Sequence, residues 1–147
     1  MKRDYPDRPI IGVGAAIVSN GRILLVRRAA EPLKGQWSIP GGALELGETL
    51  HDGVRRETLE ETGLQVEPKL VLEVFDSIFH DERGRTQYHY VLIDYLCRVT
   101  GGEACAGSDV SEVRWGTEDE LSGLGLRESI ERVVRKGLEA ARYYLTR

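Results

Sequence analysis

The 147-residue sequence predicts an α/β fold in which a mixed β-sheet lies between helices. Two observations support this prediction. Segments with the apolar or alternating pattern of strands are interrupted by one helix near the middle of the chain. An apolar stripe at helical spacing then marks a long helix towards the C-terminus. We expect a single domain that covers residues 1–147.

The first two predicted strands form a hairpin. Residues from Ile10 to Val18 are apolar almost throughout, which is typical of a strand covered on both faces. Asn20-Gly21 follows, and this dipeptide suits the positive φ angles of a tight turn. The segment RILLVRRA therefore returns as a second strand. After the polar loop EPLKGQ, we expect WSIP to be short and extended, because the residue before Pro40 is disfavoured in the α region.

A helix is predicted between Thr49 and Gly63. Thr49 and Asp52 match the pattern of a helix start, and Gly63 suits the left-handed residue that ends a helix. Gly53 weakens this helix by about 1 kcal/mol relative to alanine. Either another group approaches Gly53 closely, or the helix tolerates a weak position.

The second half of the chain predicts a further pair of strands and two helices. Strand-favouring residues run from Leu70 to Phe79 and from Thr86 to Val99, on either side of the turn-like HDERGR. TEDE at residues 117–120 is a capping box that opens a short helix. In the strand that starts at Thr86, we expect one face to pack in the core: Val91, Ile93, Tyr95, Cys97 and Val99. The terminal helix carries its apolar stripe at Ile130, Val133, Val134, Leu138, Ala141 and Leu145.

Composition and charge narrow the class of protein. Hydrophobic residues make up 41% and charged residues 30% of the chain, as in ordinary globular proteins. The net charge of −4 does not favour a nucleic-acid partner. The N-terminal MKRDYPDRP lacks the apolar core of a signal peptide, and IIGVGAAIV is too short to cross a bilayer. We therefore expect a cytoplasmic protein without a membrane partner, in which Cys97 and Cys105 are reduced packing residues.

Three glutamates fall within five residues of the predicted mid-chain helix: Glu57, Glu60 and Glu61. At about 100° per residue they share one side of the helix, where like charges cost a few tenths of a kcal/mol for each pair. A divalent cation would relieve this repulsion, and Mg²⁺ commonly bridges carboxylates to substrate phosphates. Taken singly, each glutamate would more often be a solvated side chain neutralised by Arg55 or Arg56.

The spacing of these glutamates relative to Gly42, Glu48, Arg56 and Gly63 resembles the Nudix box, G-x5-E-x7-R-E-U-x-E-E-x-G-U, where U is a bulky aliphatic residue. Thr58 departs from the box, at a position where an aliphatic residue is usual. The predicted strands before the box and the helix near the C-terminus are also compatible with a Nudix domain. The resemblance implies a Nudix-type α/β/α sandwich with a mixed β-sheet, a catalytic helix after the Gly-Gly loop and a long C-terminal helix.

The resemblance also implies roles for individual residues. The implied ligands of Mg²⁺, for which Mn²⁺ can substitute, are the backbone carbonyl of Gly42 and the carboxylates of Glu57, Glu60 and Glu61. Arg56 would orient a catalytic carboxylate through a bidentate pair, with Glu48 as its partner or as a further ligand.

The implied reaction is the attack of water on a nucleoside diphosphate that is linked to another moiety. ADP-ribose is the first expected substrate, and its products would be AMP and ribose 5-phosphate. Two alternatives are a hydrolase that removes oxidised nucleoside triphosphates and a Nudix-fold nucleotide sensor without catalysis. A small-molecule nucleotide is the expected partner in each case, and a homodimer is left open.

Contacts with the nucleotide are indicated only by residue type. Aromatic side chains can stack on a base, and arginine can bind phosphate. The candidates are Arg27, Trp37, His80 and Tyr88, together with Glu112, which is expected in a loop-like stretch before Trp115 and could supply a late carboxylate. For each of them, packing or a surface position is the alternative.

Overall fold

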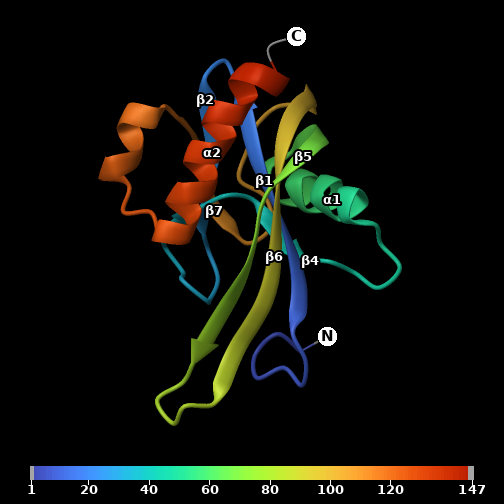
Figure 1. Ribbon diagram of the computed structural model, residues 1–147, viewed down its shortest axis with the longest axis vertical. Helices are drawn as coiled ribbons and strands as arrows, with labels where there is room; N and C mark the ends of the chain where they lie inside the picture. Colours follow the sequence, from blue (N-terminus) through green and yellow to red (C-terminus); the bar gives the residue numbers. More distant parts are fainter. Residues whose placement is uncertain (1, 146–147) are drawn as a thin grey trace.

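The computed structural model describes residues 2–145, which form an α/β domain around one mixed sheet (Figure 1). Within these residues the sheet has seven strands in the order β3-β2-β1-β6-β5, with β4 paired to β1 and β7 paired to β2. The strands are β1 (Ile10–Ser19), β2 (Arg22–Arg28), β3 (Trp37–Ser38), β4 (Gly41–Ala43), β5 (Leu64–His80), β6 (Thr86–Gly102) and β7 (Val110–Gly116). The helices are α1 (Leu50–Thr62), the 3₁₀ helix η1 (Glu118–Gly123) and α2 (Glu128–Tyr144).

Strand β1 lies at the centre and determines how the sheet is assembled. It pairs in parallel with β6, and it pairs antiparallel with β2 across the turn at Asn20-Gly21, where both residues have positive φ. It also pairs antiparallel with β4, so that Gly14 lies opposite Gly41. A Cβ atom on Gly41 would collide with the carbonyl oxygen of Val13, so this close approach requires glycine. The predicted hairpin and mixed sheet are confirmed.

Helices α1 and α2 cover opposite faces of the sheet, as Figure 1 shows for the two sides of β1. Alternate residues of β1 join the two hydrophobic clusters, with Ala16 packed in the cluster of α2 and Ile17 in the cluster of α1. The α2 cluster contains Val133, Val134, Leu138 and Ala141 of the predicted apolar stripe. The α/β/α sandwich and the long C-terminal helix are therefore confirmed.

The long β5–β6 hairpin extends away from the helices at the bottom of Figure 1. The predicted start of β6 at Thr86 is confirmed. The outer ends of the two strands were predicted wrongly, because β5 begins at Leu64, directly after the helix, and β6 continues to Gly102. The first part of β5 was not predicted because it contains Pro68, and proline is rare in strands. The register with β6 shifts between Pro68 and Leu70, and this irregularity accommodates the proline.

The stretch around Glu112 was predicted to be loop-like, and this is also wrong. It forms β7, which pairs antiparallel with β2 along most of its length. Its sequence, VSEVRWG, is too polar to show the pattern of a buried strand. The pairing with β2, a contact distant in sequence, decides its structure.

The two cysteines are both free thiols, but they differ in environment. Cys97 is fully buried in the core, as predicted. Cys105 is exposed, so its prediction as a packing residue is wrong. No helix of the described chain is long and apolar enough to cross a membrane.

Candidate active site

Helix α1 has the boundaries that its capping residues predict. The Thr49 hydroxyl accepts a hydrogen bond from the backbone N–H of Asp52 at 3.1 Å. Gly63 ends the helix in the left-handed conformation, with φ of 74°, and its N–H donates to the carbonyl of Leu59. These caps fix the two ends of the helix, and the packing of Val54, Thr58 and Thr62 sets which of its faces is turned towards the sheet.

Gly53 brings α1 close to the loop that precedes it. A Cβ atom at this position would lie 2.8 Å from Cδ1 of Leu44 and 3.2 Å from Oε1 of Glu48. The glycine therefore serves a close approach. It allows the Glu48 side chain to reach across the first turns of the helix towards Arg56.

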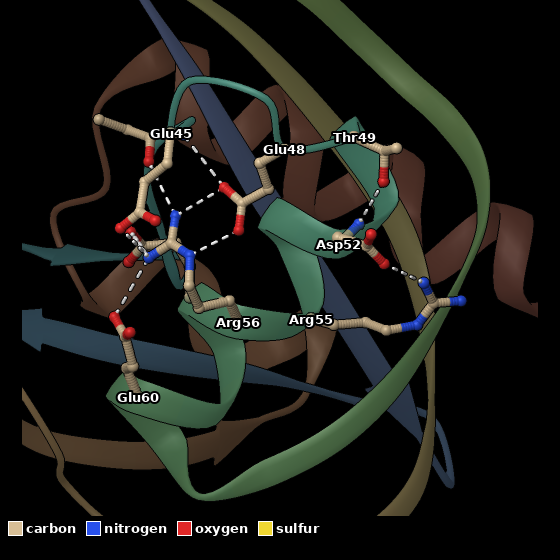
Figure 2. A network of polar contacts seen from close by, with 9 residues as sticks. Glu45, Glu48, Thr49, Asp52, Arg55, Arg56 and Glu60 are labelled. Carbon is tan, nitrogen blue, oxygen red and sulfur yellow. Dashed lines mark hydrogen bonds and ion pairs between the residues drawn. The ribbon is translucent and has the colours of Figure 1, made fainter.

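Arg56 is the centre of a polar network, which Figure 2 shows. Its guanidinium group holds Glu48 at both oxygens, with Nε to Oε2 at 2.7 Å and Nη2 to Oε1 at 2.9 Å. Nη2 also donates to the carbonyl of Ala43, which ties the helix to β4. The hydrogen bonds from Arg56 lower the pKa of Glu48, so this pair remains ionised.

The remaining nitrogen of Arg56 faces the glutamates of the box. Nη1 donates to Oε1 of Glu57 at 2.9 Å and to Oε2 of Glu60 at 3.3 Å. Arg56 thus positions Glu57, and Glu48 positions Arg56.

Replacing Arg56 with lysine is expected to lower kcat about tenfold, or about 1.4 kcal/mol of transition-state stabilisation, with little change in KM. Lysine lacks the planar fork that holds Glu48 and Glu57 simultaneously. Steady-state kinetics of Arg56→Lys would measure this. Arg55→Lys is the matched control, because Arg55 is exposed and pairs only loosely, at 3.3 Å, with Asp52. Equal kinetics in both variants would contradict a positioning role for Arg56.

Glu57 and Glu61 point towards Gly41 and Gly42, which lie on the strand β4 and not in the predicted Gly-Gly loop. The backbone N–H of Gly41 donates to Oε1 of Glu61 at 2.9 Å. A Cβ atom on Gly42 would collide with the carboxylate of Glu57, so the glycine leaves room for this side chain. Glu60 is exposed at the rim.

Burial dominates the electrostatics of these two glutamates. It raises the pKa of Glu57, which is only 8% exposed, and the Arg56 interaction partly offsets the effect. Burial, together with a smaller contribution from the charge of Glu57, raises the pKa of Glu61 to about 7 against the opposing hydrogen bond from Gly41. The structure therefore holds two neighbouring acids whose surroundings disfavour the charged form, as at many functional sites.

A cavity of about 630 Å³ opens beside the box, a size typical of small-molecule sites. Gly42 and the α1 residues Glu57 and Glu61 line what we call the acidic end of this cavity. Four other lining residues, Trp37, Ile39, Phe75 and Ile130, belong to the hydrophobic cluster of α2, and together with Phe79 and Tyr90 they form what we call its aromatic end. The acids and the aromatic rings thus line the same cavity.

Of the residues predicted to contact the nucleotide, Trp37 lines this cavity. Arg27 does not, because its exposed side chain donates to the Gly35 carbonyl and pairs with Glu112 at 3.0 Å. Glu112 lies opposite Arg27 in the register of β2 and β7, and its carboxylate forms this ion pair. Glu112 therefore does not line the cavity that contains Glu57 and Glu61.

His80 and Tyr88 also lie outside the lining of the cavity. His80 is exposed at the end of β5. The Tyr88 ring packs edge-on against Phe79, with centroids 6.2 Å apart, and Phe79 contributes to the cavity instead.

A match to a family model shows to which protein family the chain belongs. The model described as NUDIX domain matches residues 8–137. The chain belongs to the NUDIX domain family. The resemblance inferred from the box is confirmed.

Several relatives share this NUDIX domain. The ADP-ribose pyrophosphatase of Methanocaldococcus jannaschii is 39% identical over 107 residues, covering 73% of this chain and 61% of that protein. A solved MutT NUDIX hydrolase from Burkholderia pseudomallei is 32% identical, with a TM-score of 0.76 over 88% of this chain and 98% of that one. An ADP-ribose pyrophosphatase from Streptococcus suis is 30% identical, with a TM-score of 0.70 over 92% of this chain and 93% of that one. The chain spans about three-fifths of the length of the curated relatives it matches first.

The NUDIX site offers the hard oxygen donors that Mg²⁺ prefers. Within residues 2–145, no group of three or more His, Cys, Asp or Glu side chains is arranged so that it could hold a metal ion. The reason is local, since Arg56 binds both Glu57 and Glu60 and keeps them at its own nitrogen. By donor chemistry, the buried Glu57 and the partly buried Glu61 beside a glycine backbone nevertheless fit a divalent cation.

The cavity residues that the sequence analysis did not predict include Phe75, Asp94 and Arg127. Phe75 and Arg127 have no signal in the sequence, because only packing brings β5 and the start of α2 to the cavity. Asp94 has one, since it interrupts the apolar run YVLIDYLC of a buried strand. A lone carboxylate in such a run needs a reason.

Proposed function

We propose that this NUDIX-domain protein hydrolyses the diphosphate bond of a nucleoside diphosphate linked to a sugar, with ADP-ribose as the substrate and AMP and ribose 5-phosphate as the products. The observation that carries the proposal is the single cavity, which has acids at one end and aromatic rings at the other. A diphosphate needs charge compensation and a base needs a flat apolar surface, and this cavity offers a place for each. The names of the Methanocaldococcus and Streptococcus relatives support the choice of ADP-ribose.

Mg²⁺, or Mn²⁺ in its place, would be held by Glu57, Glu60, Glu61 and the carbonyl of Gly42. When bound, it neutralises the diphosphate and polarises the phosphorus atom. For Glu60 to take part, its carboxylate has to leave Nη1 of Arg56, a contact of 3.3 Å at an exposed position. That contact is weak enough to exchange for a cation.

Side chains and backbone groups of the protein orient the acids, accept the proton and bind the base. Arg56 keeps Glu57 oriented, and the Gly41 N–H keeps Glu61 oriented. Burial raises the pKa of both carboxyl groups in the metal-free protein, and one of the acids of the site would take the proton of the attacking water. Trp37 and the other rings of the cavity would hold the base.

With millimolar Mg²⁺, purified protein is expected to convert ADP-ribose to AMP and ribose 5-phosphate, and a chelator should abolish the reaction. The measurement is product identification by chromatography after incubation with ADP-ribose, other nucleotide sugars and nucleoside triphosphates. Turnover of nucleoside triphosphates alone would contradict ADP-ribose as the substrate, but it would still agree with hydrolysis at the acids of the site. Tight nucleotide binding without turnover of any substrate would favour a sensor.

A further inference from the structure

The aromatic end of the cavity contains one buried charged residue, Asp94. It lies on β6, it is 3% exposed, and it lines the cavity. Among residues 2–145 no hydrogen bond or ion pair reaches its carboxyl group. A buried carboxyl group without a partner costs free energy unless a ligand supplies one.

The sheet makes room for this carboxyl group. Gly14 is the register partner of Asp94 on β1, and a Cβ atom on Gly14 would collide with Oδ1 of Asp94. Cδ1 of Ile39 would lie 3.2 Å from the same Cβ atom. Phe75 and Ile130 line the same cavity and belong, with Ile39, to the hydrophobic cluster of α2. The carboxyl group therefore lies in a mainly apolar part of the cavity.

The surroundings favour the neutral form of Asp94. Burial raises its pKa to about 7, and the charge of Glu73 on β5 adds to the effect. The nearby cations have other partners: Arg132 and Lys136 of α2 bind Glu73, and Arg127 lies over the Phe79 ring at 5.1 Å. A neutral carboxyl group offers one donor and one acceptor side by side.

Adenine presents the complementary pair on its pyrimidine edge, an amino group that donates and the ring nitrogen N1 that accepts. A site built to hydrogen-bond a polar group of its ligand discriminates strongly against an analogue that lacks it, because the buried group then stays unpaired. Aromatic and aliphatic walls suit the faces of the same ring.

We propose that Asp94 determines the base specificity of this site, by accepting a hydrogen bond from the amino group of adenine and donating one to N1. In the choice of adenine the inference rests on the proposed function, whereas the role of Asp94 rests on its burial and on the cavity.

The test measures binding, so it does not depend on turnover. Calorimetry at pH 6.5 would compare AMP with purine riboside 5′-monophosphate, which lacks only the amino group. The parent is expected to prefer AMP about tenfold. Asp94→Asn should keep this preference, because an amide also has one acceptor and one donor. Asp94→Leu should bind both nucleotides equally, and Asp76→Asn, which changes an exposed acid on β5, should behave as the parent does.

Three outcomes would overturn the proposal. They are equal binding of the two nucleotides by the parent, a preference kept by Asp94→Leu, or a preference lost in Asp94→Asn, whose amide supplies the same acceptor and donor. Circular dichroism would establish that both Asp94 variants are folded. If the parent binds the two nucleotides equally but hydrolyses ADP-ribose, the role of Asp94 is contradicted and the proposed reaction stands. If the parent prefers AMP through Asp94 but does not hydrolyse ADP-ribose, only the proposed reaction is contradicted.

Discussion

Replacing Glu61 with glutamine is expected to reduce Mg²⁺-dependent hydrolysis on the order of a hundredfold, about 2.7 kcal/mol. The amide cannot supply the negative charge that a cation requires, although its carbonyl can still accept the Gly41 N–H. The metal-free variant should be at least as stable as the parent, because it no longer buries an acid next to Glu57. A loss of function combined with an undamaged fold would identify the carboxylate as part of the site.

Thermal unfolding gives a second reading of the same change. Mg²⁺ should stabilise the parent by RT ln(1 + [Mg²⁺]/Kd), about 2.7 kcal/mol at one hundred times Kd, and an equal ionic strength of NaCl should not. Glu61→Gln should lose most of this shift. Glu139→Gln is the matched control, since Glu139 is exposed on α2 and does not line the cavity. Equal Mg²⁺ shifts in parent and Glu61→Gln, with activity retained, would remove Glu61 from the site.

The second large effect is on the pH dependence of stability, and it comes from Asp94. Its pKa rises from 3.8 to about 7 on folding, so between these values the native state keeps a proton that the unfolded state has lost. The free energy of unfolding therefore falls as pH rises through this window, and it levels off above pH 7. Asp94→Asn has no proton to lose. From pH 5 to pH 8 its stability should rise relative to the parent by about 2–3 kcal/mol.

Urea unfolding of parent, Asp94→Asn and Asp76→Asn at pH 5, 6, 7 and 8 would measure the effect. Glu61 produces a slope of the same sign, because its pKa is also raised to about 7, but it does so equally in all three proteins. The difference between parent and Asp94→Asn isolates Asp94. A difference that does not change with pH would show that the Asp94 carboxyl group ionises normally in the native protein.

The sequence by itself determined the local features of this protein. Thr49 and Gly63 set the ends of α1, Asn20-Gly21 set the first hairpin, and the apolar stripe set α2. Each depends on residues a few positions apart, so the signal is complete within a short window. The box is also a local feature, because almost all of its residues lie on one helix and in the loop before it.

Only the tertiary structure decided the features that depend on distant pairing. Strand β7 exists because β2 pairs with it, and that pairing joins Glu112 to Arg27. Asp94 becomes a cavity residue because β1 contributes a glycine opposite it. Such contacts join residues tens of positions apart, and no local pattern encodes them. The acidic end of the cavity was therefore readable from the sequence, and the end that would hold the base required the folded sheet.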